Sequence, residues 1–226
     1  MRRLVIKKNV TVRKKIYEYL REQLLSGQIA PHQHLIEAKI AEEIGTSRTP
    51  VREALHSLEL EGLIESIPRV GYVVKPISEG EVEEICEIRA AIEALAARWA
   101  MEKAYKKLVG ELKKNISLSE EKVSKGEVRA FVDMDAQFHE IISKFSGSNR
   151  LLELAQTLRR HMLRYRIQSI YLVDNVLRAI DGHKGILRAI EKRNLEEVSK
   201  AIQRHMEQVK KDVLRYAFKE IPKGKS

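Results

Sequence analysis

The sequence lacks several features that would set it apart from an ordinary globular protein. It has a single cysteine, Cys86, among 226 residues, which excludes an internal disulfide and a cysteine-based zinc ribbon and favours a small buried side chain there. No uninterrupted apolar run approaches the roughly 20 residues that cross a bilayer, and the basic amino terminus has no apolar core of signal-peptide length. We therefore expect a cytoplasmic protein that makes no contact with a membrane.

Acidic side chains are outnumbered by basic ones, and this excess is the first indication of a partner. The formal net charge is +10 and the sequence pI is about 9.6, which favours a polyanion without identifying it. Residues 1–76 carry 13 Lys and Arg against 9 Asp and Glu, so the excess is not confined to one region. Only the first 21 residues are lopsided, with eight basic side chains against Glu18. Such an arm supports nucleic-acid binding only together with a sharper motif.

Two short helices are predicted near the amino terminus. Apolar residues recur at helical spacing over residues 11–26, and Gly27 stops the run. The segment EAKIAEEIG, residues 37–45, has the same spacing and is closed by Gly45. The intervening piece, QIAPHQHLIE, contains one proline and two histidines and is expected to form a turn.

A third helix is predicted to begin after Thr46 and Ser47, whose hydroxyl groups can accept hydrogen bonds from the free amides of its first turn. Pro50 suits that turn because it has no amide hydrogen to leave unsatisfied. Arg48 and Arg52 lie four residues apart, so both project from one face of this helix. The opposite, buried face is expected to comprise Val51, Leu55, Leu58 and, at its end, Leu60.

A β-hairpin is predicted to follow the third helix. In LIESIPRVGYVVKPIS, β-branched residues flank a turn that contains Pro68, Arg69 and Gly71. Three short helices followed by a hairpin make a winged helix-turn-helix. In that architecture the amino-terminal end of the third helix enters the DNA major groove, where free amides favour phosphate and an arginine can bind guanine O6 and N7. The alternative is a solvated arginine pair that only balances Glu53 or Glu59.

These residues resemble the amino-terminal domain of the GntR family of bacterial transcription regulators. The match comprises SRTPVREAL, preceded by LIEAKIAEEIGT and followed by LELEGLIESIPRVGYVV, and it covers roughly residues 10–76. One position departs from the pattern, because Ala38 stands where some members carry an arginine early in the second helix. The operator preference of those members therefore does not carry over to this chain.

The resemblance also implies roles for individual residues. It assigns the base contacts to Arg48 and Arg52. It implies that two hydroxyl side chains contact phosphates and that two residues of the wing reach the adjacent groove. These four residues are Ser47, Thr49, Arg69 and Gly71.

From Ser78 onward the sequence has no strand signals and is predicted to be helical throughout. Short breaks such as KGE, SGSN and KRN separate stretches in which apolar residues recur at three-and-four spacing. About six helices joined by short loops should pack as an antiparallel bundle, whose core is a usual place for a ligand or metal site. The predicted helices are residues 79–104, 106–125, 128–146, 149–171, 175–193 and 195–219.

Four side chains in this second part have the chemistry of a metal site. Asp135 and His139 are four residues apart and share one helix face, whereas His183 and His205 lie on two later helices that a bundle can bring together. Three imidazoles and a carboxylate suit a borderline divalent ion, zinc or nickel before manganese or cobalt, and leave coordination positions for an anionic ligand. Each histidine taken singly could instead be structural.

The spacing of these four residues resembles the helical effector domain, of FCD type, in the FadR subgroup of the same family. The resemblance covers most of residues 78–219. In metal-binding members an Asp-xxx-His pair and two further histidines bind a divalent cation, to which small organic acids coordinate. The resemblance further implies that Arg89 pairs with the effector's carboxylate; the alternative is a surface arginine paired with Glu93 one turn on. His161 is near enough in sequence to line the cavity but is expected outside the set of metal ligands.

We therefore expect a mainly α, metal-containing and ligand-responsive transcription repressor. Residues 1–76 would form the winged helix-turn-helix domain, and residues 78–226 an all-α antiparallel bundle for effector binding and dimerisation. A homodimer would match a palindromic operator in double-stranded DNA. Two alternatives remain: the metal could be purely structural, or the chain could be a metal-dependent hydrolase fused to a DNA-binding domain. No general base stands out near the four ligands and the paired Glu-x-x-His motifs of di-iron bundles are missing, which disfavours the hydrolase.

Overall fold

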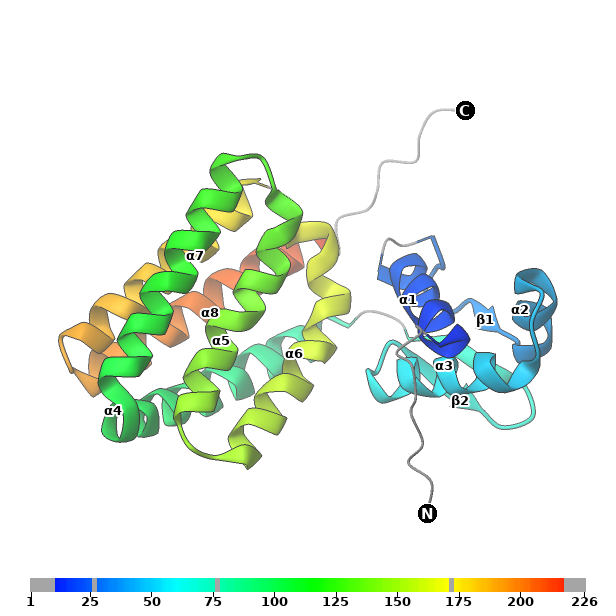
Figure 1. Ribbon diagram of the computed structural model, residues 1–226, viewed down its shortest axis with the longest axis horizontal. Coiled ribbons are helices and arrows are strands. Elements are labelled where there is room, and N and C mark those ends of the chain that lie inside the picture. Colours follow the sequence, from blue (N-terminus) through cyan, green and yellow to red (C-terminus); the bar gives the residue numbers. More distant parts are fainter. Residues whose placement is uncertain (1–10, 26–27, 76–77, 171–172, 218–226) are drawn as a thin grey trace, which may run out of the picture. The chain divides into compact units, whose positions relative to one another are not determined.

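The chain divides into two units, residues 1–76 and 77–226. It is mainly helical, and this confirms the predicted fold class (Figure 1). The computed structural model describes four stretches of it: residues 11–25, 28–75, 78–170 and 173–217. The basic arm expected at residues 1–10 lies outside these described residues. None of the helices within the described stretches combines the length and the apolar character that a membrane span requires.

Within its described residues the first unit has three helices: α1 (Val12–Leu25), α2 (Glu37–Ile44) and α3 (Arg48–Leu60). Gly45 ends α2 in the left-handed conformation, with φ of 72°, which a glycine adopts without steric cost. The apolar faces of the three helices meet in one core, to which α1 contributes Ile16. This core fixes the orientation of α3, the predicted DNA-reading helix.

The buried face of α3 agrees with expectation except at its last residue. Val51, Leu55 and Leu58 are fully buried, and Ala54 lies beside them. Leu60 is 67% exposed, because two residues beyond Leu58 a helix has turned by about 200°. The prediction that Leu60 belongs to the core was wrong for this geometric reason.

A small antiparallel sheet forms the wing, with strand order β1-β3-β2. The expected hairpin comprises β2 (Ile64–Ile67) and β3 (Gly71–Val74), paired so that Ile67 lies opposite Gly71. The third strand, β1 (His34–Leu35), lies within the segment predicted to be only a turn and pairs with β3. β1 was missed because two residues are too short to show an alternating pattern.

The second unit is a helical bundle, as predicted. Its longest helix is kinked at Ala104, whose backbone is not helical, close to the break expected after residue 104. Cys86 is buried in this unit, as expected of a small apolar side chain. The elements are α4 (Glu79–Ser124), the short 3-10 helix η1 (Val128–Ala130), α5 (Phe131–Phe145), α6 (Asn149–Ile170), α7 (Val173–Glu191) and α8 (Leu195–Ala217).

The packing of the second unit brings distant parts of the sequence together. α4 packs against α5 and α8, and α7 packs against α8. Apolar side chains such as Leu108, Phe138, Ile186 and Ile202 form one buried core between these helices. The predicted metal ligands are on α5, α7 and α8, so they lie on the helices that this core holds together.

Candidate nucleic-acid interface and metal centre

The amino-terminal end of α3 presents polar side chains to solvent. Ser47, Arg48 and Thr49 are all exposed, which a DNA contact requires. Ser47 occupies the capping position, but its side chain makes no capping hydrogen bond, contrary to expectation. That hydroxyl group therefore does not occupy the amide hydrogens of the first turn. Free amides at the amino-terminal end of a helix can bind a phosphate.

Arg52, one turn further along α3, is held by a carboxylate of α2. Its Nε donates to both oxygens of Glu37 at 3.0 Å, and its Nη2 donates to Oε2 at 2.8 Å. The Arg52 side chain remains 66% exposed, so the guanidinium still faces solvent. Glu37, and not the expected Glu53 or Glu59, is the acidic partner of this arginine.

The two predicted wing residues differ in what their positions require. Arg69 is exposed in the hairpin turn, with φ of 66°. Gly71 is half-buried at the start of β3, with φ of 123°, and a Cβ there would lie 2.9 Å from the Leu35 carbonyl oxygen. Gly71 is thus needed for the close approach of β1, whereas Arg69 is the residue whose side chain can reach outward.

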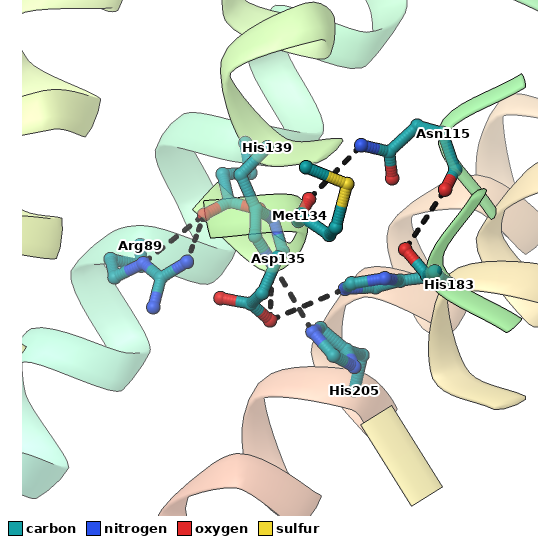
Figure 2. Close-up of polar contacts among 9 residues, drawn as sticks. Arg89, Asn115, Met134, Asp135, His139, His183 and His205 are labelled. Atoms are coloured by element: carbon teal, nitrogen blue, oxygen red, sulfur yellow. Dashed lines mark hydrogen bonds and ion pairs between the residues drawn. The ribbon is translucent and has the colours of Figure 1, made fainter. Parts of the chain in front are cut away.

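The four predicted metal ligands converge inside the helical unit (Figure 2). Asp135 and His139 come from α5, His183 from α7 and His205 from α8. One ligand atom from each lies within 4.8 Å of all the others. The Nε2 atoms of His139 and His205 are 3.4 Å apart. Asp135 Oδ1 lies 3.5 Å from His183 Nε2 and 3.9 Å from His139 Nε2, so these four residues could together hold one divalent ion.

Burial governs the protonation of His205 in this cluster. Its four side chains are between 1% and 3% exposed. Burial, and after it the neighbouring His183 and His139, lowers the pKa of His205 well below its usual range. A lowered pKa keeps the imidazole neutral, which is the form that binds a metal. Three imidazoles and one carboxylate therefore fit a divalent ion such as zinc or nickel.

The backbone of α7 approaches the His205 ring closely at Gly182. A Cβ at position 182 would lie 2.3 Å from His205 Nδ1, whereas at Gly185, almost one turn later, the nearest atom to such a Cβ is at 3.9 Å. On the other side of the cluster, Phe138 stacks on His183 with ring centroids 3.8 Å apart. The requirement for glycine at position 182 was not predicted, although a glycine inside a helical pattern is a signal of close packing.

Arg89 is a buried residue of α4, not the surface residue of the alternative interpretation. Its side chain is 1% exposed. It pairs with Glu93, as that interpretation expected, through Nε at 3.1 Å and Nη2 at 2.8 Å from Oε1. Its third nitrogen, Nη1, is buried and has no hydrogen-bond partner among the described residues. A buried guanidinium with such an unused donor can receive an anion.

Glu93 contacts the metal cluster as well as Arg89. Its Oε2 lies 2.6 Å from Nδ1 of His139. Burial alone would raise the pKa of Glu93, but the charges and hydrogen bonds of His139 and Arg89 outweigh it and lower the pKa to about 2. The spacing of the sequence predicts only the pairing with Arg89. A glutamate in the otherwise apolar stretch AAIEALAA was the available signal, since a buried charge is normally paired.

The remaining histidines lie outside the cluster. His161, on α6, is half-buried and is not among the grouped ligand atoms of the described residues, in agreement with its expected position outside the set of ligands. His32, His34 and His56 are exposed. An open groove of about 420 Å³ runs between α4 and α8, but none of the four cluster residues lines it.

A winged helix-turn-helix with exposed arginines on its third helix, joined to a helical bundle, defines the class of DNA-binding transcription regulators. Family comparison identifies the group within that class. Residues 12–74 match the family described as Bacterial regulatory proteins, gntR family, and residues 84–208 match the FCD domain. The chain therefore belongs to the gntR family and carries an FCD domain, which confirms the resemblance seen in its sequence.

Curated relatives match most of the chain. The HTH-type transcriptional repressor RspR of Escherichia coli K12 is 27% identical over 202 residues, 89% of each chain. The Gluconate operon transcriptional repressor of Bacillus licheniformis is 27% identical over 197 residues, 84% of this chain and 80% of the relative. Both relatives are named as repressors. The family to which the chain belongs consists of regulatory proteins, so the chain is a transcription regulator and not the hydrolase considered above.

The solved structure of E. coli McbR/YncC has the same fold as this chain. The TM-score is 0.70 at 24% sequence identity, and the match covers 92% of this chain and 99% of the other. At that identity the likeness concerns the fold alone. It extends through both units, since it spans nearly the whole of each chain.

Proposed function

We propose that this DNA-binding regulator is a metal-containing repressor whose affinity for its operator is changed by a small carboxylate effector. The observation that carries the proposal is the buried cluster of Asp135, His139, His183 and His205, with ligand atoms within 4.8 Å of one another. Arg89 supports it, because its Nη1 is a buried donor without a partner among the described residues. A donor for an anion at Arg89, together with ligands for a cation at the cluster, suits the carboxylate of an organic acid.

In this proposal the Asp135 carboxylate and the three imidazoles hold a divalent ion, zinc or nickel before manganese or cobalt. When bound, the ion supplies positive charge and open coordination positions that a carboxylate oxygen can occupy. The ligands come from α5, α7 and α8. Any displacement of one ligand is therefore transmitted to the packing of three helices.

The effector is proposed to be a small organic acid held at two points. Its carboxylate would coordinate the ion and accept a hydrogen bond from Nη1 of Arg89, the nitrogen that Glu93 does not use. Charge-assisted contacts of this kind favour an acid over a neutral sugar. One relative is named for the operon of gluconate, which is the anion of such an acid. The effector changes operator affinity only if it prefers one of two states of the protein.

For DNA we propose that Arg48 and Arg52 read base edges in the major groove. Phosphate contacts from two hydroxyl groups and a wing in the adjacent groove complete the interface. A homodimer would place two copies of α3 on a palindromic operator, and the protein would act in the cytoplasm, where bacterial DNA lies. The further residues of this proposed interface are Ser47, Thr49, Arg69 and Gly71.

The proposal is tested by titrating organic acids into the nickel- or zinc-loaded protein and measuring its affinity for a selected operator fragment by gel shift. We expect at least one acid to change the affinity of the wild-type protein. Asp135→Asn replaces the negatively charged ligand by a neutral side chain of nearly the same shape. This variant should bind the operator but no longer respond to the acid. If no acid in the series alters the affinity of the metal-loaded protein, the effector role fails while DNA binding stands.

A purely structural ion is the second candidate function, and the depth of the site favours it. The ligands are between 1% and 3% exposed, and an ion so enclosed would tie three helices together. In that case a chelator would lower the melting temperature and leave the response of the operator complex to acids unchanged. Under our proposal the chelator changes both, so the two measurements made on one sample decide between them.

A further inference from the structure

The two oxygens of the Glu93 carboxylate have separate partners. Oε1 accepts from Nε and Nη2 of Arg89 at 3.1 and 2.8 Å, and Oε2 lies 2.6 Å from Nδ1 of His139. Arg89, Glu93 and His139 are 1%, 2% and 3% exposed, respectively. Water therefore does not compete for these contacts. One buried carboxylate thus joins the residue proposed to receive an anion to a residue proposed to bind a metal.

The contact with Glu93 decides which nitrogen of His139 carries the proton. A carboxylate only accepts hydrogen bonds, so Nδ1 must be the donor, and in the neutral ring, the form that binds a metal, Nε2 then has the lone pair. That lone pair is on the atom that lies 3.4 Å from His205 Nε2 and 3.9 Å from Asp135 Oδ1. Histidine ligands of metals commonly donate their other N–H to a carboxylate, which fixes the ring and makes it a stronger ligand.

The same carboxylate holds Arg89 in a fixed position. Two of the guanidinium nitrogens donate to Oε1, and Nη1 is the one left without a partner among the described residues. An unpaired buried arginine would be strongly disfavoured, so Glu93 stabilises the charge while leaving one donor for a ligand. Glu93 therefore acts on both of the groups that an acid would contact.

We propose that Glu93 is the positioning residue of the ligand site: it directs His139 Nε2 toward the ion and orients Arg89 so that Nη1 can receive the effector. This inference rests on the proposed function. A glutamine at position 93 has nearly the same shape but only one acceptor oxygen, and its NH2 group would face a donor. It cannot keep both contacts as they are: either Arg89 loses its acceptor, or the NH2 group donates to Nδ1 of His139 and moves the ring hydrogen to Nε2, the atom proposed to bind the ion.

The first test uses the wild-type protein and no substitution. Nitrogen-15 NMR of the histidine side chains in the metal-free protein, recorded at mildly alkaline pH, reports which nitrogen of each ring carries the hydrogen. We expect the hydrogen of His139 on Nδ1. A hydrogen on Nε2 overturns the inference, whatever the behaviour of any variant.

The second test compares Glu93→Gln with Glu102→Gln, an exposed glutamate of the same helix. Competition with a chromophoric chelator measures the affinity for nickel, and we expect about a 10- to 100-fold loss in the first variant and none in the second. The absorption spectrum of the cobalt-loaded proteins should change only in Glu93→Gln, since an altered His139 changes the ligand field. A change in stability alone would not produce that spectral difference.

The outcomes separate this inference from the proposed function. A wild-type protein that binds neither nickel nor zinc overturns both. A wild-type protein that binds nickel, together with a Glu93→Gln variant of unchanged affinity and unchanged cobalt spectrum, overturns the role of Glu93 alone. The inference is supported by two results together. Nickel binding is weakened and the cobalt spectrum altered in Glu93→Gln only, and His139 of the wild type carries its hydrogen on Nδ1.

Discussion

Each unit of the molecule contains an arginine paired with a glutamate, and the two pairs differ mainly in burial. The closest nitrogen–oxygen distance is 2.8 Å in both, but Arg52 and Glu37 are 66% and 22% exposed, whereas Arg89 and Glu93 are 1% and 2% exposed. Water and salt screen the first pair and not the second. The same two functional groups therefore have different consequences in the two places.

The difference in burial indicates what each arginine can do. An exposed ion pair contributes little to stability and is readily exchanged for another anion, so Arg52 can leave Glu37 for a base or a phosphate. A buried pair is costly to break, because the partner left behind remains uncompensated. Arg89 is therefore suited to receive a ligand without moving, and Arg52 to change partners on binding DNA.

Breaking the buried pair should have the largest effect. Arg89→Met leaves the Glu93 carboxylate without its cationic partner, and we expect the second unit to lose about 3–5 kcal/mol of unfolding free energy. Arg52→Met removes the exposed partner and should leave the unfolding of the first unit unchanged. Urea unfolding of the metal-free proteins, followed by circular dichroism, compares the two. Equal shifts in both variants would contradict the importance of burial.

Adding one methyl group to the buried site should have the next largest effect. In Gly182→Ala the new Cβ would lie 2.3 Å from His205 Nδ1, so the imidazole must move and nickel affinity should fall by about 100-fold or more, beyond the usual effect of outer contacts. Gly185→Ala is the matched control in the same helix and should retain full affinity. Isothermal titration calorimetry measures both, and equal affinities would show that His205 is not a ligand.

Removing the exposed arginine should affect DNA and leave the metal untouched. We expect Arg52→Ala to lower operator affinity by about 5- to 150-fold, the range for one bidentate base contact, with a smaller loss on unrelated DNA. Lys39→Ala, which removes an exposed cation of α2, serves as the control. Fluorescence anisotropy at fixed salt gives the affinities. If the affinities for operator and unrelated DNA fall equally, Arg52 contacts phosphate and not a base.

Mild acid should distinguish the two units further. The pKa of His205 is lowered in the fold, so between its unfolded value of about 6.5 and the lower folded value the unfolded chain binds a proton that the folded one does not. The metal-free second unit should therefore lose stability as the pH falls below about 6.5. The ratio of folded to unfolded protein should fall by up to about tenfold per pH unit. The Glu93 contribution, with a pKa of about 2, is still present there. Thermal melts from pH 7.5 to 5.5 measure the change, and the variant His205→Phe should flatten it.

The smallest effect is expected from Glu37→Gln. Losing the carboxylate frees the Arg52 side chain and removes a negative charge near the DNA, so binding to unrelated DNA should strengthen while operator binding gains nothing. We expect the ratio of operator to non-specific affinity to fall a few-fold, on the order of 1 kcal/mol or less, as for other exposed pairs. Competition gel shifts with both DNAs give this ratio. An unchanged ratio would mean that Glu37 does not position Arg52.

Residues whose placement depends on local spacing were predictable from the sequence. The helices of both units follow the recurrence of apolar residues. The convergence of Asp135, His139, His183 and His205 is not local: a helical bundle permits it, and the family resemblance predicted it. Family resemblance added Arg89. The sequence alone could not show that Arg89 is buried, because its i+4 pairing with Glu93 is equally compatible with a surface.

The features that were missed depend on contacts between distant segments. The contact of Glu93 with His139 joins α4 to α5, and the short strand β1 exists only because β3 lies beside it. Leu60 and the Ser47 cap were wrong for a different reason, since both depend on local angles at the ends of α3. Helix ends are less well encoded by periodicity than helix interiors.

The closeness of α7 to the last helix has a consequence for the evolution of this regulator. A side chain of any size at position 182 fills the space that the ring at position 205 requires. A descendant that acquires such a side chain displaces the ring and weakens the centre, and one that keeps the ring in place must keep the glycine. These two positions, 23 residues apart in the chain, should be inherited as a pair wherever the centre persists.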